Sequence, residues 1–180
     1  MCSRVGGNIE RHLALRREND GKKIEVEIVS AAVNDVMPLR ERIMYPGRPD
    51  KCVQEEDHKD HARHLAARTV CTHSDDSSVE TDGEVVGIVS VFLPLPDTKE
   101  GAMFRKLAVD PKWQGSGLGS TLVRAAAEVA RVAGAGRLFC HVRVSANVET
   151  FYTKKLGFSR RCGPFYRYEC DDILELDLLL

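Results

Sequence analysis

An excess of charge of either sign is missing from this sequence. Its 180 residues hold 26 lysines and arginines against 27 aspartates and glutamates, and the formal net charge is −1. Proteins whose main partner is a nucleic acid usually carry a clear basic excess. The balance therefore predicts no nucleic-acid partner.

Closely spaced cysteine pairs are missing as well. The six cysteines are irregularly spaced and none belongs to a Cys-x-x-Cys pair. Zinc sites and disulfide frameworks depend on such spacing, so we predict neither. The lack of a disulfide framework predicts a reducing, cytoplasmic compartment. His58, His61 and His64 recur at every third position, but no cysteine or His-Glu-x-x-His pattern accompanies them, so they predict no metal either. Cys140 lies in an apolar run and is expected to be a small buried side chain.

Long apolar runs are the third absence. None is long enough for a membrane span, and the N-terminal residues are too polar for a secretory leader, so no membrane partner is expected. Residues 1–20 mix arginines with acidic residues, which predicts a disordered tail, with an organelle-targeting leader as the alternative. The remaining residues, 21–180, have the length of a single domain.

The hydrophobic pattern predicts a mixed α/β domain with one central sheet. Strands are expected at residues 24–29, 64–72, 84–93, 102–109, 137–144 and 173–178, and helices between Asn34 and Pro46, over 118–133 and between Asn147 and Gly157. Asn34 or Asp35 would cap the first helix, and Asn147 the last. Residues 55–71 have a second interpretation, a single helix, but their β-branched residues favour a loop followed by a strand. The polar residues 73–83 suggest a hairpin with a lengthened loop.

A glycine-rich stretch, WQGSGLGS at residues 113–120, stands between a predicted strand and an alanine-rich predicted helix. A P-loop would require a lysine directly after the last glycine, whereas Ser120 follows Gly119. A dinucleotide fingerprint would require a third glycine at position 120, where this sequence has Ser120, and an acidic residue further on. The sequence lacks both. The remaining pattern is Gln-x-x-Gly-x-Gly, carried by Gln114, Gly117 and Gly119. Glycines at a helix start let backbone amides approach a pyrophosphate closely.

Together with this loop, the segments FRKLAVDPKWQGSGLGSTLV and CHVRVSANVETFYTKKLGF resemble the GNAT superfamily of acyl-CoA N-acyltransferases. The ordered set of strand, Gln-x-x-Gly-x-Gly, helix, strand, asparagine and FYTKKLGF carries the resemblance, which covers the cofactor half of that fold. The resemblance implies a central mixed, mostly antiparallel sheet of about six to seven strands, flanked by helices.

The resemblance also implies a site for acetyl-CoA, with no metal. The strand before the loop would carry a bulge, and its backbone at Leu107, Ala108 and Val109 would meet the pantetheine arm and the thioester. A backbone amide there would stabilise the oxyanion of the tetrahedral intermediate. Asn147 would contact the pantetheine arm. The pyrophosphate would be held by the loop residues Gln114, Gly115, Ser116, Gly117, Leu118, Gly119 and Ser120.

Tyr152 stands where the family often keeps a tyrosine that contacts the cofactor and acts as general acid toward the leaving thiolate. A phenol titrates near pH 10, so it can donate a proton at neutral pH. The alternative is that Phe151 and Tyr152 are core aromatics of a short helix.

A general base is harder to find. Many family members use a glutamate on the strand before the loop, but residues 103–106 read Met-Phe-Arg-Lys. His141 and His64 are the candidates, because histidine titrates in the useful range. Asp57 and Glu84 are weaker candidates, and a chain of water molecules is a further alternative.

These features predict an N-acetyltransferase that moves an acetyl group from acetyl-CoA to a primary amine by direct attack on the thioester. The acceptor would be a small molecule or a peptide, bound by residues 36–60 and 161–169, and the protein would act as a monomer or homodimer. The missing carboxylate leaves a catalytically weak acyl-CoA-binding sensor or adaptor as the alternative. A nucleotide-binding protein is a third possibility, which the missing lysine disfavours.

Overall fold

The computed structural model describes residues 12–19, 22–70, 83–94, 101–168 and 171–180. These residues form eight strands: β1 His12–Asn19, β2 Lys22–Ala31, β3 Ala62–Val70, β4 Val85–Phe92, β5 Ala102–Val109, β6 Arg137–Arg143, β7 Ser159–Tyr168 and β8 Asp171–Leu179. The helices are α1 Val33–Ile43, α2 Leu118–Val132 and α3 Glu149–Leu156. Short 3-10 turns lie at η1 Pro49–Lys51, η2 Glu55–His58, η3 Pro111–Trp113 and η4 Val144–Ala146.

The strands form one sheet in the order β1-β2-β3-β4-β5-β6-β8-β7. Strands β5 and β6 are parallel, and every other neighbouring pair is antiparallel. The predicted fold class, a mixed and mostly antiparallel sheet flanked by helices, is confirmed, with eight strands instead of six to seven. Residues 55–71 form a turn and a strand, not a helix. Strands β3 and β4 pair as the predicted hairpin, whose connection, residues 71–82, lies outside the described residues.

Two strands were not expected from the sequence. A disordered tail is the prediction for residues 1–20, but residues 12–19 form β1, which pairs with β2 in an antiparallel ladder. Residues 1–11 lie outside the described residues. Strand β7 pairs with β8 at the opposite edge. Both lie at the edges of the sheet, and neither sequence, HLALRREN or SRRCGPFYRY, has the sustained alternation of apolar and polar residues that predicts a strand.

The helix starts also differ from the prediction. Helix α1 begins after Ala32, whose amide donates a hydrogen bond of 3.0 Å to Asp35 in the first turn. Helix α3 begins after Val148, while Asn147 ends the preceding turn with a φ of 51°. Asparagine tolerates this left-handed conformation better than most residues, which gives Asn147 a backbone role in place of the predicted cap.

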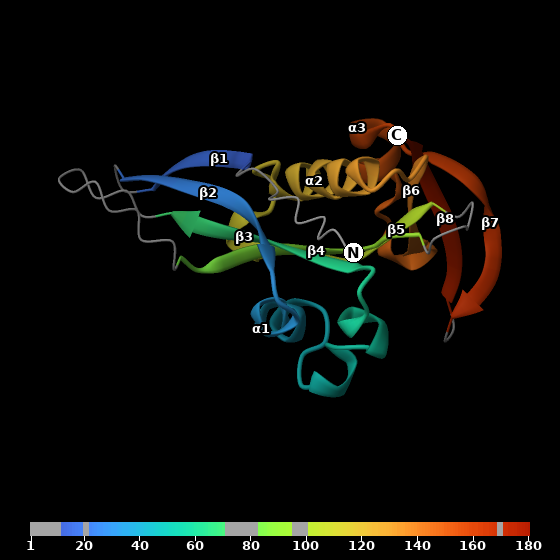
Figure 1. Ribbon diagram of the computed structural model, residues 1–180, viewed down its shortest axis with the longest axis horizontal. Helices are drawn as coiled ribbons and strands as arrows, with labels where there is room; N and C mark the ends of the chain where they lie inside the picture. The colour runs from blue at the N-terminus through green and yellow to red at the C-terminus, as the bar shows by residue number, and fades with distance from the viewer. Residues whose placement is uncertain (1–11, 20–21, 71–82, 95–100, 169–170) are drawn as a thin grey trace, which may run out of the picture.

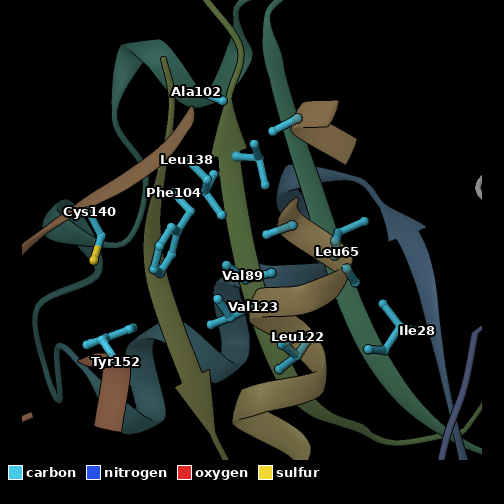
Figure 2. Close-up of a cluster of buried hydrophobic side chains, with 14 of the residues drawn as sticks. Ile28, Leu65, Val89, Ala102, Phe104, Leu122, Val123, Leu138, Cys140 and Tyr152 are labelled. Carbon is cyan, nitrogen blue, oxygen red and sulfur yellow. The ribbon is translucent and has the colours of Figure 1, made fainter. Parts of the chain in front are cut away.

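Helices α2 and α3 cover one face of the sheet, and α1 covers the other (Figure 1). The larger apolar cluster lies on the α2 side and includes Leu65, Val89, Phe104 and Leu122 (Figure 2). The smaller cluster lies under α1 and joins Val36, Leu39, Ala66, Ile88 and Ala108. Neighbouring residues of β3 and β4 thus point into different clusters, which explains why β4 reads as a continuous apolar run. Cys140 is buried as predicted, at 3% exposure.

No helix in the described ranges is long and apolar enough to cross a membrane.

Candidate active site

Strands β5 and β6 run side by side but separate after two residue pairs (Figure 1). The ladder joins Ala102 to Leu138 and Met103 to Phe139, although each strand continues for several more residues. From Phe104 onward, β5 therefore has no ladder with β6. Backbone groups along such an open strand edge can hold an extended ligand by main-chain hydrogen bonds.

The open part of β5 contains a β-bulge. Val89 of β4 faces two residues of β5, Lys106 and Leu107, because the register shifts between Ile88 and Ser90. Lys106 has a φ of 56°, in the left-handed region. An expected bulge is thus present at the start of the segment 107–109, and it redirects the strand at this point.

The glycine loop folds back onto the end of β5. The Gln114 side chain donates a hydrogen bond of 3.1 Å from Nε2 to the carbonyl of Val109. Gly115 and Gly117 have φ values of 78° and 91°, which other residues take only with strain. The Ser116 hydroxyl donates a hydrogen bond of 2.6 Å to the carbonyl oxygen three residues earlier. The glycines and these two bonds set the shape of the loop.

Helix α2 begins directly after Gly117. The first amides of a helix have no acceptor inside the helix, and the helix dipole adds partial positive charge there. A side chain built at Gly119 would meet Phe151 Cζ at 3.6 Å and Val109 Cγ2 at 3.7 Å. The start of α2 therefore lies beside the end of β5 and beside α3, in an environment suited to an anion such as a pyrophosphate.

Tyr152 of α3 lies where β5 and β6 separate. Its ring packs against Phe104, the first β5 residue beyond the ladder, with centroids 5.9 Å apart, and against Phe158 at 5.7 Å. It belongs to the same cluster as Leu138 and Cys140 (Figure 2). Burial raises the pKa of the Tyr152 phenol, with a smaller contribution from Cys140, so the phenol stays protonated. This packing is also what the core-aromatic alternative predicts.

Predicted site residues from three elements thus come together: Val109 of β5, Gly119 of α2 and Tyr152 of α3. Asn147 is exposed in the connection from β6 to α3. Glu84 forms an exposed ion pair of 3.6 Å with Arg42, which also binds Asp110 just after β5, at 2.7 Å.

Five buried polar side chains form a second group on the α1 side of the sheet. We name it the Asp57 cluster; its members, each no more than 7% exposed, are Arg40 of α1, Asp57 of η2, His64 of β3, Ser90 of β4 and Lys106 of β5. It therefore joins three neighbouring strands to α1 and to the segment that follows α1.

Arg40 and Lys106 both bind the Asp57 carboxylate. The Arg40 guanidinium donates to both carboxylate oxygens, at 3.0 and 3.2 Å, and Lys106 Nζ donates to Oδ2 at 2.8 Å. Both side chains also donate to the carbonyl of Cys52, at 2.8 and 3.1 Å. Arg40 Nε is buried without a hydrogen-bond partner among the described residues. The cluster thus holds two cations and one anion.

The electrostatics of the cluster keep Asp57 ionised. Burial by itself would raise the pKa of the Asp57 carboxyl, but hydrogen bonds from Lys106, the Gln54 amide and Arg40 outweigh it, and the pKa lies below its ordinary value. Burial lowers the pKa of the Lys106 ammonium, and its bond to Asp57 only partly offsets this.

Both ring nitrogens of His64 are occupied within the cluster. Nε2 lies 2.9 Å from the carbonyl of Asp57 and so carries the proton; Nδ1 lies 2.8 Å from Ser90 Oγ and accepts from it. The Ser90 oxygen accepts in turn from Arg40, at 2.6 Å. Burial lowers the pKa of the His64 imidazole, and the nearby cations oppose its protonation. As a general base His64 would have to break these bonds, so the structure gives this candidate a structural role.

His141 has a different environment. It lies on β6 opposite Glu175 of β8, and its Nε2 is 3.3 Å from Glu175 Oε2, with 31% of its side chain exposed. Burial by itself would raise the pKa of the Glu175 carboxyl, but hydrogen bonds from Arg137 and His141 lower it overall. The ionised carboxylate favours the tautomer with the proton on Nε2 and orients the imidazole ring. Because Cys140 points into the α2-side cluster, His141 points toward the opposite face of the sheet.

The sequence analysis missed Arg40, Ser90, Lys106 and Glu175. A usable indication existed for two of them. Arg40 shares the apolar stripe of α1 with Val36, one turn earlier, and a cation on such a stripe suggests a buried partner. Lys106 interrupts the buried strand β5 in the same way. No group of three or more potential metal ligands occurs among the described residues.

Residues 33–158 match the family described as the acetyltransferase (GNAT) family. The chain belongs to the GNAT family of acetyltransferases. A curated relative of this GNAT protein comes from Bacillus subtilis (strain 168) and carries the provisional assignment of a ribosomal protein bS18-alanine N-acetyltransferase. It is 33% identical over 79 residues, which are 44% of this chain and 50% of the relative. The match thus spans only half the length of that relative.

Solved GNAT structures share the fold. The IAA acetyltransferase from Bacillus cereus ATCC 14579 has a TM-score of 0.62 and 20% identity, covering 86% of this chain and 99% of that one. The GNAT domain of PAT from S. lividans has a TM-score of 0.61 and 19% identity, covering 94% and 97%. At 19–20% identity the likeness shows the fold and does not identify the acceptor.

Proposed function

We propose that this GNAT protein transfers an acetyl group from acetyl-CoA to a primary amine by direct attack of the amine on the thioester. The observation that carries the proposal is the position of the glycine loop: it closes onto the end of β5 at Val109, where β5 has already separated from β6. An extended acyl-CoA arm would bind along the open edge of β5, with its pyrophosphate at the amides from Gln114 to Ser120.

The chemistry needs an oxyanion donor and a proton donor. The amine nitrogen forms a bond to the thioester carbon, the carbonyl oxygen becomes an oxyanion, and the intermediate expels the CoA thiolate. Backbone amides of residues 107–109, directed by the bulge, would stabilise the oxyanion. The Tyr152 phenol would donate a hydrogen bond to the departing sulfur. Its raised pKa favours a hydrogen bond over complete proton transfer, so solvent would complete the protonation of CoA.

The amine has to lose a proton before or during its attack. Of the two histidine candidates, His141 is the better base, because it is partly exposed and the Glu175 carboxylate orients its ring, whereas His64 is buried in the Asp57 cluster. Glu175 thus serves as the group that sets the histidine tautomer, as carboxylates do in other histidine-based sites.

The acceptor class is suggested by the curated relative. Its provisional assignment names an alanine of ribosomal protein bS18, so peptides that carry an alanine with a free amine are the first acceptors to test, beside polyamines and free amino acids. The test measures free thiol released from acetyl-CoA with each acceptor, and mass spectrometry of the product locates the added acetyl group. Binding of acetyl-CoA without turnover on any amine would contradict the proposed transfer.

The missing carboxylate on β5 supports a second candidate, an acyl-CoA-binding sensor. Tyr152→Phe separates the two. In an enzyme, kcat should fall about 10-fold or more while the affinity for CoA, measured by calorimetry, stays within a factor of about 3. Phe151→Leu is the matched control, because it alters a neighbouring aromatic of α3 without removing a hydroxyl. Unchanged kcat in Tyr152→Phe would remove the phenol from the mechanism.

A further inference from the structure

The bulge of β5 determines which side chains face which layer. Phe104 before the bulge packs on the α2 side, and so do Leu107 and Val109 after it. In a regular strand, alternation would place residues 106 and 108 on that side. Instead Lys106 joins the Asp57 cluster and Ala108 packs under α1. The extra residue thus reverses which face of the sheet the following side chains point to, and it does so where the open edge of β5 begins.

Lys106 takes an unfavourable backbone conformation to form this bulge. Its φ of 56° is shared, among the described non-glycine residues, only by Asn147. Asparagine tolerates the left-handed region, whereas a long side chain such as lysine enters it only when its surroundings compensate. The compensation has to come from contacts of the Lys106 side chain.

Those contacts are buried and come from a distant segment of the chain. The Lys106 side chain is 4% exposed, and its ammonium donates to Asp57 Oδ2 at 2.8 Å and to the carbonyl of Cys52 at 3.1 Å. Asp57 is itself held by Arg40 and by the amide of Gln54, at 2.8 Å. If the bulge moved toward the C-terminal end of β5, Lys106 would leave the α1 side and the ammonium would lose both acceptors.

We propose that the Asp57–Lys106 ion pair holds the β5 bulge in place, which makes both side chains positioning residues for the backbone amides that meet the thioester. This inference rests on the proposed acetyl transfer. Neither side chain touches the reacting atoms. The pair links the segment 49–58, which follows α1, to the strand that would bind the acyl group.

Lys106→Met tests the inference. Methionine keeps the apolar stem and burial, and it leaves the Arg40–Asp57 pair in place, so the cluster of the variant holds one cation and one anion. The expected result is a kcat lowered about 10- to 100-fold, with the Kd for CoA changed less than about 3-fold, because displaced amides affect the transition state more than the pyrophosphate. Arg131→Met is the matched control: it removes a positive charge from an exposed ion pair with Glu128 in the last turn of α2.

Lys106→Gly provides a second variant. Glycine takes a φ of 56° without strain, so it should retain the bulge without the ion pair and recover part of the lost kcat. Equal losses in the methionine and glycine variants would overturn the inference, and so would an unchanged kcat in Lys106→Met.

Amide shifts of Leu107 and Ala108 in ¹⁵N spectra test the geometry independently of turnover. They should move in Lys106→Met and stay in place in Arg131→Met. Unmoved shifts overturn the ion pair as the determinant of the bulge. If the wild-type protein turns over no amine, the proposed function fails, while the amide shifts still decide whether the pair holds the bulge.

Discussion

Removing the negative charge of Asp57 should destabilise the protein strongly. Its two oxygens accept four hydrogen bonds, from Arg40 at 3.0 and 3.2 Å and from Lys106 and the Gln54 amide at 2.8 Å each. In Asp57→Asn, a donor amide would face at least one of these donors, and two buried cations would lack an anion. Breaking a buried pair in this way costs about 3–5 kcal/mol. The free energy of unfolding of a domain is about 5–15 kcal/mol, so the loss is a large fraction of it.

Urea unfolding at pH 7, followed by circular dichroism, measures this loss. The control is Asp50→Asn in the same segment, because Asp50 pairs with Arg48 at 3.1 Å but is 63% exposed, and such pairs contribute about 0–1 kcal/mol. The double variant Asp57→Asn with Lys106→Met removes one of the two unpaired cations and should recover part of the stability. A loss below about 1 kcal/mol in Asp57→Asn, equal to that of the control, would refute the assignment of a buried, charged cluster.

Three further predictions concern His64, His141 and the glycine loop. The free energy of unfolding should fall as the pH drops below about 6.5, because the unfolded chain binds a proton that His64, with its lowered pKa, does not bind in the folded protein. This contribution is at most about 1.4 kcal/mol per pH unit. In His64→Gln the urea midpoint should therefore change less between about pH 6.5 and pH 5. His141→Ala should lower kcat/KM about 100-fold at pH 7, while an unchanged kcat/KM would exclude it as the base. Gly117→Ala, strained at a φ of 91°, should weaken CoA binding at least about 5-fold by calorimetry, whereas Gly136→Ala, outside the loop, should leave the affinity unchanged.

The structure decided between alternatives that the sequence left open. His64 and His141 looked equivalent in the sequence, because each is a histidine in a predicted strand. Their surroundings depend on neighbours such as Ser90 and Glu175, and these lie 26 and 34 residues away in the chain. No local pattern carries that information.

The acyl-donor half of this protein was predictable from sequence because it is local. Strand β5, the glycine loop and α2 are consecutive, and glycine at positions 115 and 117 permits the positive φ values that the loop adopts. The Asp57 cluster was not predictable as a group, because its members come from five elements and are joined only when three strands and α1 pack together. A buried charge is stable only with its partner, so the tertiary structure alone decided that Lys106 is buried beside Asp57 and is not a surface lysine.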